Sequence, residues 1–290
     1  MRQRLISAAV LVPVVAIVFI AGQPWLSIAI ALLSALAAYE TAQLVRRAGL
    51  PANPWLAVVA PPIAVLAFEA AIGPGRVDWG WLLIAPAVAL WVIATAVDGL
   101  RNSDARIGFK TWAGTTIAGL YPSLLGCAAG IASVRLTVEH SIDAFGVFDV
   151  GRLWLVVLVL TVWTLDSAAY VAGRYHGRGR FMNHISPNKT WSGAIGGTIA
   201  AVAVCTLLVA LLYLRNPVLG FVLGLVIAVS AQAGDLAESM LKRAAGAKDS
   251  GTLIPGHGGI LDRVDSFLFA APAAYTVLIG YSLLVPGASI

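Results

Sequence analysis

Hydrophobic runs of about 20 residues recur along the whole chain, and each is long enough to cross a hydrocarbon layer about 30 Å thick as an α-helix. Short polar segments separate the runs. The pattern predicts an all-α fold, a polytopic transmembrane helical bundle of about nine spans. The predicted spans are residues 5–22, 24–45, 54–73, 79–100, 112–134, 151–173, 192–214, 217–239 and 262–284.

The first run follows Arg2 and Arg4, as the apolar part of a signal peptide follows its basic start. It is long, lacks an obvious small-residue cleavage site and leads directly into another span, so we interpret it as a retained first helix.

Lysine and arginine are distributed unevenly between the connecting segments. With a cytoplasmic N-terminus, all but four of the 19 Lys and Arg residues fall on the cytoplasmic side. The exceptions are Arg76, Arg135, Arg152 and Arg215. Because cytoplasmic loops are enriched in these residues, we expect the N-terminus inside and the C-terminus outside (N-in/C-out), in the inner (cytoplasmic) membrane.

The composition excludes a water-soluble domain. The chain is 59% hydrophobic and 11% charged, whereas soluble domains are about 25% charged. The net charge of +5 is explained by the orientation signal and by attraction to anionic membrane lipid, so it indicates no nucleic-acid partner. Cys127 and Cys205 lie in apolar runs without metal-site or disulfide spacing, and we expect them to be packing residues.

The chain has two regions of different character. Residues 1–135 form an N-terminal region of about five transmembrane helices with few polar residues, and residues 150–290 form a C-terminal region of about four, which we expect to be catalytic. Two long polar loops of the C-terminal region, 174–191 and 240–261, face the cytosol in this orientation. No internal repeat is evident, which argues against a transporter built from inverted halves. Small residues at 193–197 permit close helix contact, either within the chain or in a homodimer.

Acidic residues of the predicted spans gather at the cytoplasmic ends. Because an ionised group inside a bilayer is unfavourable, such acids usually face the protein interior or a cavity and are functional. Alternatively, helix ends near the membrane surface simply tolerate acidic residues. This interpretation explains any single acidic residue better than it explains the whole cluster. The residues are Glu40, Asp166, Asp235, Glu238, Asp262 and Asp265.

The segment 234–265 has the residues expected of a metal-assisted polyphosphate site. Asp262 and Asp265 are three residues apart, so they would share a face in the first turn of a helix that starts near residue 259 or 260. Carboxylates are hard ligands of the kind that magnesium prefers. The neighbouring glycines would let backbone N–H groups approach a phosphate at the helix N-terminus.

Basic residues surround this segment. They would attract phosphate, although the same side chains could serve only as cytoplasmic anchors. They are Lys242, Arg243, Lys248 and Arg263.

The segment resembles the signature of CDP-diacylglycerol synthases, also called phosphatidate cytidylyltransferases. The resembling string is Ser239-x-Leu241-Lys242-Arg243, four residues, Lys248-Asp249-x-Gly251, two residues, Ile254-Pro255-x-His257-Gly258-Gly259-Ile260-x-Asp262-Arg263-Val264-Asp265. All its fixed positions are filled. The resemblance covers about residues 150–270 and extends upstream to Asp166, Tyr170, Gly173, Arg174 and 186–191. Asn188 and Ser192 depart from the family pattern, which has a lysine and a glutamate there.

The resemblance implies a magnesium-dependent nucleotidyltransferase of phospholipid biosynthesis. The phosphate of phosphatidic acid would attack the α-phosphorus of CTP, giving CDP-diacylglycerol and pyrophosphate. The implied metal ligands are Asp235, Asp262 and, third, Asp265, and two Mg²⁺ ions are expected. The other implied catalytic residues are Lys242, Asp249 and His257. The implied substrate-binding residues are Lys242, Arg243, Lys248, Gly258, Gly259, Arg263, Lys189, Asp166 and Ser239.

We expect His257 to contact phosphate rather than to act as a general base, because a phosphomonoester is already anionic near about pH 7. The 186–191 loop has two interpretations. Ser186 and Pro187 could form only a turn before a helix whose cap follows, or the loop could be a lid or lipid-phosphate clamp charged by Lys189. Asp166 and Tyr170 are one helical turn apart and could line the same cavity.

Two other functions remain open. A CTP-dependent kinase of a polyprenol or another lipid alcohol would need a similar site but would move the γ-phosphoryl group, and the length of the 242–265 resemblance argues against it. A cation transporter would distribute acids across the membrane thickness, whereas here they gather at the cytosolic end, with Glu69 the main exception.

Overall fold

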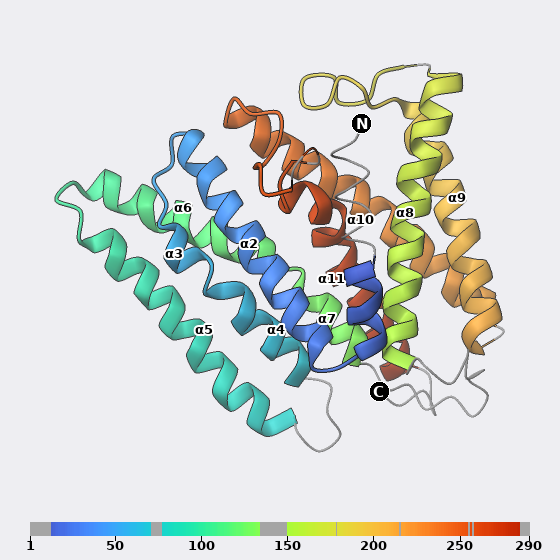
Figure 1. Ribbon diagram of the computed structural model, residues 1–290, viewed down its shortest axis with the longest axis horizontal. Coiled ribbons are helices and arrows are strands. Elements are labelled where there is room, and N and C mark those ends of the chain that lie inside the picture. The colour runs from blue at the N-terminus through green and yellow to red at the C-terminus, as the bar shows by residue number, and fades with distance from the viewer. Residues whose placement is uncertain are drawn as a thin grey trace. The chain divides into compact units, whose positions relative to one another are not determined.

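The computed structural model describes residues 13–70, 77–133, 150–177, 179–214, 216–254, 256 and 258–284. Within these ranges the regular structure is helical, without a strand, and two isolated β-bridges join Arg180 to Thr190 and Ile254 to Gly258 (Figure 1). The predicted all-α class is confirmed.

A helical segment at 13–21 precedes the labelled helices. The labelled helices are α2 (Trp25–Arg47), α3 (Pro54–Ala57), α4 (Ala60–Ala70), α5 (Val77–Leu100), α6 (Ala105–Ser123), α7 (Gly126–Ser133), α8 (Val150–His176), α9 (Trp191–Val209), η1 (Ala210–Leu214, a π-helical turn), α10 (Pro217–Ala244) and α11 (Leu261–Leu284).

The described residues contain 6 helical segments that are long and apolar enough to cross a membrane. The chain is therefore a multi-pass membrane protein. The segments are Trp25–Arg47, Ala105–Ser133, Val150–His176, Trp191–Leu212, Pro217–Ala244 and Leu261–Leu284.

Each of these segments contains most of one predicted span. The predicted spans 54–73 and 79–100 correspond to the shorter apolar helices Pro54–Glu69 and Ala85–Leu100, and part of the predicted span 5–22 lies outside the described residues. The count of nine and the orientation stay predictions.

The chain forms two compact units. Unit 1 comprises Met1–Gly130 and Leu241–Val264, and unit 2 comprises Ile131–Met240 and Asp265–Ile290. The predicted loop 240–261 thus lies almost wholly in the unit that contains the N-terminal helices.

Close approach of helices in unit 1 depends on residues without bulky side chains. A Cβ at Gly114 of α6 would collide with the carbonyl oxygen of Pro51, and a Cβ at Gly119 would collide with the ring of Trp91 on α5. The Trp91 indole N–H donates to the carbonyl oxygen of Leu56 in α3 at 2.7 Å. These contacts hold α6 against α5 and the segment that contains α3.

In unit 2, α8 and α9 run antiparallel and side by side (Figure 1). A Cβ at Gly193 would lie 2.8 Å from the carbonyl oxygen of Ala169, and one at Gly197 would lie 2.8 Å from that of Leu165. The small residues at 193–197 therefore serve contact within the chain, one of the two uses considered for them.

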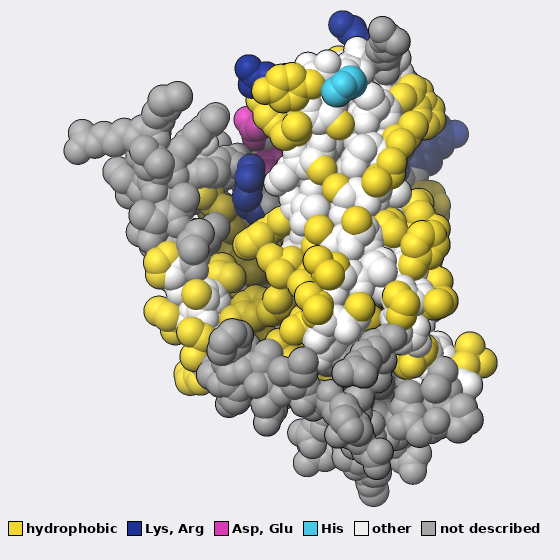
Figure 2. Space-filling model, turned by 90° about the vertical axis from the view of Figure 1, so that its right-hand side faces the viewer, with side chains coloured by type: hydrophobic (Ala, Val, Ile, Leu, Met, Phe, Trp, Pro, Cys, Tyr) yellow, Lys and Arg dark blue, Asp and Glu magenta, His cyan; other side chains and the backbone are white. Residues whose placement is uncertain are grey.

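The outer face that α8 and α9 present is hydrophobic along most of its length, with basic side chains toward one end (Figure 2). Exposed apolar residues of these two helices include Leu160, Trp163, Val171, Ile195 and Ile199. Such a surface would be unfavourable in water and is typical of helices that contact lipid.

Candidate active site

The implied site residues fall into two groups, one in each compact unit, and α10 contributes to both. Unit 2 contains Asp166, Lys189, Asp235, Ser239 and Asp265, whereas unit 1 contains Lys242, Arg243, Lys248, Asp249, Gly258, Gly259, Asp262 and Arg263. His257 lies outside the described residues.

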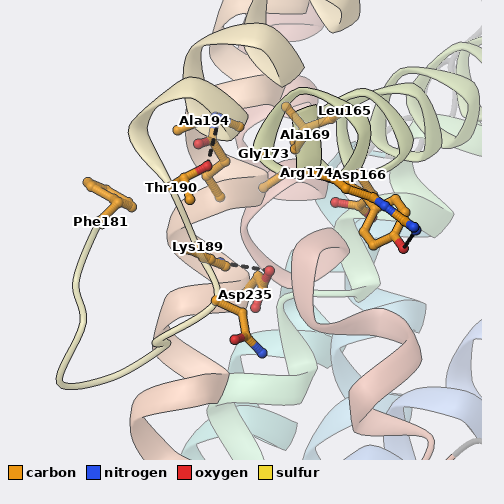
Figure 3. Close-up of a pocket in the computed structure, with 15 residues that line it drawn as sticks. Leu165, Asp166, Ala169, Gly173, Arg174, Phe181, Lys189, Thr190, Ala194 and Asp235 are labelled. Carbon is orange, nitrogen blue, oxygen red and sulfur yellow. Dashed lines mark hydrogen bonds and ion pairs between the residues drawn. The ribbon is translucent and has the colours of Figure 1, made fainter. Parts of the chain in front are cut away.

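A cavity of about 440 Å³ opens in unit 2, bounded by α8, the loop after it, the start of α9 and α10 (Figure 3). Its polar lining includes Asp166, Tyr170, Arg174, Lys189, Gln232 and Asp235. The expectation that Asp166 and Tyr170 line one cavity is confirmed.

The loop before α9 closes on itself and presents Lys189 to this cavity. The Lys189 N–H donates to the Ser186 carbonyl oxygen at 3.2 Å, closing a turn around Pro187, and the Phe181 N–H donates to the Lys189 carbonyl oxygen at 2.9 Å. Thr190 caps α9 by accepting from the Gly193 N–H at 3.1 Å. The turn and the cap predicted for this loop are both present, and together they fix where the lysine points.

Lys189 reaches from the loop to α10. Its Nζ lies 2.7 Å from Oδ2 of Asp235, and the two side chains are 25% and 32% exposed. Figure 3 shows this ion pair within the cavity. Ser239, one turn later, donates its hydroxyl to Asp235 Oδ1 at 3.4 Å.

Asp265 lies close to the same stretch of α10. A Cβ at Gly234 would be 2.6 Å from the Asp265 carbonyl oxygen, so the backbones of α10 and α11 touch beside Asp235. Within unit 2, two of the three implied metal ligands thus lie on helices in direct contact.

On α8, Asp166, Tyr170 and Arg174 follow one another at intervals of four residues and so share one helix face. Arg174 Nη1 donates to the Tyr170 hydroxyl at 3.1 Å. The cavity wall therefore combines two carboxylates, Asp166 and Asp235, with two cations from separate segments, Arg174 and Lys189. The two cations suit a ligand that carries phosphate.

In unit 1, Asp262 organises the segment between α10 and α11, residues 245–260, which we call the signature loop. Its Oδ1 accepts from Lys242 Nζ at 2.7 Å, and its Oδ2 accepts from the N–H groups of Ser250 at 2.8 Å and Gly259 at 2.9 Å. The helix that carries it begins at Leu261, within two residues of the predicted start. One carboxylate thus joins the end of α10, the loop and the first turn of α11.

The glycines of this loop are needed for its conformation. Gly258 has φ of +87°, and a Cβ there would lie 2.7 Å from Asp262 Oδ2. The Ile254 N–H donates to the Gly258 carbonyl oxygen at 2.9 Å. A side chain at 258 would therefore displace the Asp262 carboxylate as well as strain the backbone.

Three of the implied basic residues, Arg243, Lys248 and Arg263, are exposed. Arg243 Nη1 donates to the Ala247 carbonyl oxygen at 3.2 Å. Their positions are compatible with phosphate binding and with anchoring at the membrane surface, so both interpretations remain.

Sequence reasoning missed two polar residues, Ser250 and Gln232, and predicted Glu40 as a functional acid without its partners. Glu40 is buried and accepts three hydrogen bonds from the signature loop and the start of α11. Ser250 occupies a variable position of the signature string, and Gln232 of the cavity lies within an apolar run. No local pattern distinguishes these two from ordinary loop and helix residues.

Comparison with known proteins decides the family. The sequence profile described as the cytidylyltransferase family matches residues 2–280. The chain belongs to the cytidylyltransferase family. The resemblance found in the signature string is thus confirmed across almost the whole chain.

Named members of this cytidylyltransferase family are similar to the chain. It is 39% identical over 203 residues to the phosphatidate cytidylyltransferase of Brucella suis biovar 1 (strain 1330), an alignment that covers 68% of this chain and 71% of that protein. It is 44% identical over 142 residues to that of Synechocystis sp. (strain ATCC 27184 / PCC 6803 / Kazusa), covering 48% and 46%. It is 37% identical over 150 residues to that of Bacillus subtilis (strain 168), covering 51% and 56%.

Two carboxylates of this cytidylyltransferase, one in each compact unit, have the chemistry of magnesium donors. Among the described side chains, no three of His, Cys, Asp and Glu are grouped so that they could hold a metal alone. Magnesium commonly takes only one or two carboxylates and completes its shell with water and substrate phosphate. Asp235 and Asp262 are suitable donors, since each already holds a lysine ammonium group at 2.7 Å.

Proposed function

We propose that the chain is a phosphatidate cytidylyltransferase that transfers the cytidylyl group of CTP to phosphatidic acid. The observation that carries this proposal is the family match over residues 2–280, supported by relatives named for this activity. Membership of the family is the finding, and the substrates and reaction of this chain are what we propose from it.

In the proposed reaction a phosphate oxygen of phosphatidic acid forms a bond to the α-phosphorus of CTP. The bond from that phosphorus to the β-phosphate oxygen breaks, and the electron pair leaves with pyrophosphate. Such transfers need positioning of the reactants and neutralisation of negative charge more than covalent help from the protein.

The charged residues of both units suit these two tasks. Lys189 and Arg174 would bind phosphate oxygens at the cavity of unit 2, and Lys242 would do so at the signature loop. Each lysine would then exchange its aspartate partner for phosphate. Gly258, which leaves no side chain beside Asp262, would let a phosphate approach the loop there.

We propose magnesium as the cofactor, held by Asp235, Asp262 and Asp265, with two ions expected. Bound magnesium would neutralise charge on the attacking and leaving oxygens. The protein residues would bind the substrates and orient them.

We further propose the N-in/C-out orientation in the inner membrane, with the site at the cytosolic face. The hydrogen bonds from Ile260 and Leu261 to Glu40 join the C-terminal half of α2 to the start of α11. These ends then lie on one side of the membrane, which requires an even number of crossings between them. The spans predicted between residues 54 and 239 provide an even number.

The test is an assay of the purified protein with phosphatidic acid, magnesium and CTP labelled separately in its α- and γ-phosphates. We expect α-label in CDP-diacylglycerol and γ-label in pyrophosphate. If the γ-label appeared instead in a phosphorylated lipid alcohol, with CDP as the other product, the protein would be a lipid kinase.

A further inference from the structure

Glu40 is a carboxylate buried in the part of the protein that sequence reasoning left without a role. It lies on α2 and is 3% exposed. A buried charge is unfavourable unless hydrogen bonds compensate it. Here Oε1 accepts from the Ile260 N–H at 3.1 Å, and Oε2 accepts from the Leu261 N–H at 2.8 Å and from the Ser250 hydroxyl at 3.0 Å.

Two of these bonds cap a helix. The first N–H groups of an α-helix lack partners within the helix, and a negative charge is favourable there. A residue of the preceding loop usually provides such a cap. For α11 the residue that caps Ile260 and Leu261 comes from α2, more than 200 positions earlier in the chain.

The third bond connects Glu40 to Asp262. The Ser250 hydroxyl lies 3.0 Å from Glu40 Oε2 and 2.9 Å from Asp262 Oδ2. A hydroxyl has one proton, so the two carboxylates share it. The Ser250 N–H also donates to Asp262 at 2.8 Å, and a displacement of Ser250 would therefore disturb both acids.

Two glycines of the signature string make room for this carboxylate. A Cβ at Gly251 would collide with Glu40 Oε1, and a Cβ at Gly259 would collide with Glu40 Oε2 and the Ser250 hydroxyl. The loop is thus closed around Glu40, and its glycines serve this contact as well as any approach of phosphate.

We propose that Glu40 is a positioning residue of the transfer reaction, which holds the signature loop on the start of α11 and so fixes the Asp262 carboxylate. The N-terminal helices thereby contribute to catalysis without touching substrate. The inference rests on the proposed function, since it takes Asp262 to act in the reaction.

The first test is Glu40→Gln in the purified full chain, with Glu69→Gln on α4 as the matched control. The glutamine side chain has the same length, but its NH₂ group would face one of the N–H donors. We expect amide hydrogen exchange of segment 258–262 to become faster by about 10-fold or more and kcat to fall by about 10- to 100-fold, since hydrogen bonds to a charge are lost. The KM for phosphatidic acid should change little.

Exchange in α8 and α9, and all values for Glu69→Gln, should match the wild type. An unchanged exchange rate at 258–262, or an unchanged kcat, would overturn the proposal. So would faster exchange spread evenly over the whole chain, because Glu40 would then support the fold in general.

The second test is Ser250→Ala and the double variant with Glu40→Gln. Because both changes break one link, the kcat loss of the double variant should be smaller than the product of the two single losses. If the kcat loss of the double variant equalled the product of the two single losses, the two residues would act independently and the shared link would be refuted. The wild type could also make no CDP-diacylglycerol while Glu40→Gln still exchanges faster at 258–262. That result would refute the proposed function but not the role of Glu40 in holding the loop.

Discussion

Lys189 Nζ lies 2.7 Å from Asp235 Oδ2 at the cavity of unit 2, where both side chains are partly exposed. A partly exposed ion pair contributes about 0 to 1 kcal/mol to stability, so a phosphate could replace the carboxylate as the partner of Lys189 without disturbing the fold. The Lys242–Asp262 pair of unit 1 has the same 2.7 Å separation but is 13% and 8% exposed. Lys242, in the last turn of α10, is thus held more firmly than Lys189, by a carboxylate that also organises the signature loop.

The partly exposed pair gives a first prediction. Lys189→Met should lower kcat/KM by about 10- to 100-fold, because a charge-assisted contact to phosphate is lost. The free energy of unfolding should change by no more than about 1 kcal/mol. The assay with labelled CTP and a thermal unfolding curve in detergent measure the two effects.

Arg180→Met is the matched control, since Arg180 is an exposed cation of the same loop. It should leave kcat/KM within about twofold of the wild type. Equal losses in both variants would mean that the loop contributes only general positive charge.

A second prediction concerns Asp262. Asp262→Asn removes the charge that holds Lys242 and weakens the bonds from Ser250 and Gly259. We expect kcat to fall more than about 100-fold and the free energy of unfolding to fall by about 1 to 3 kcal/mol, in a protein that still inserts into the membrane. The labelled-CTP assay and detergent-based unfolding check the two values.

Asp104→Asn is the control for this variant. Asp104 caps α6 through the Arg106 N–H at 2.7 Å, and asparagine caps a helix about as well as aspartate. Its activity should match the wild type. Near-normal turnover in Asp262→Asn would exclude Asp262 from the metal site.

A third prediction tests the contact between α8 and α9. In Gly197→Ala the new Cβ would lie 2.8 Å from the Leu165 carbonyl oxygen and 2.9 Å from the Ala169 Cβ, so the helices must move apart. We expect a loss of about 1 to 3 kcal/mol in the free energy of unfolding, seen as a lower midpoint of denaturation.

Gly280→Ala is the same substitution at a helical position with nothing within 4 Å of the new Cβ. It should be neutral or stabilising by up to about 1 kcal/mol, because alanine favours the helix. If Gly197→Ala lowered the free energy of unfolding less than Gly280→Ala does, the packing described for α8 and α9 would be contradicted.

Hydropathy predicted the helices of this protein well where one apolar run forms one helix. The span predicted at 262–284 is α11, Leu261–Leu284, and the span at 151–173 lies within α8, Val150–His176. The run at 54–73 instead breaks into α3 and α4. Its residues are apolar on both sides of the break, so hydropathy gives no signal there.

The candidate site was predicted from local sequence patterns, so partners that are distant in the sequence were not predicted. The start of α11 and the position of Asp262 could be inferred because glycines and acids are closely spaced in the sequence. The contact of Glu40 with Ser250 spans 210 positions, and only the folded chain brings the two together. Spacing within one segment cannot reveal such a partner, although an acid inside a membrane span indicates that one exists.

A final prediction tests the orientation by labelling introduced cysteines from one side of the membrane. The native Cys127 and Cys205 are buried, 3% and 0% exposed, so they should react little with a polar thiol reagent. Asn183→Cys, in the exposed loop before α9, should be labelled only from the cytosolic side. Leu284→Cys, at the end of α11 and 82% exposed, should be labelled only from the opposite side. Three candidate spans, α9 with η1, α10 and α11, separate the two positions, so labelling of both from one side would contradict an odd number of crossings between them and the N-in/C-out arrangement with it.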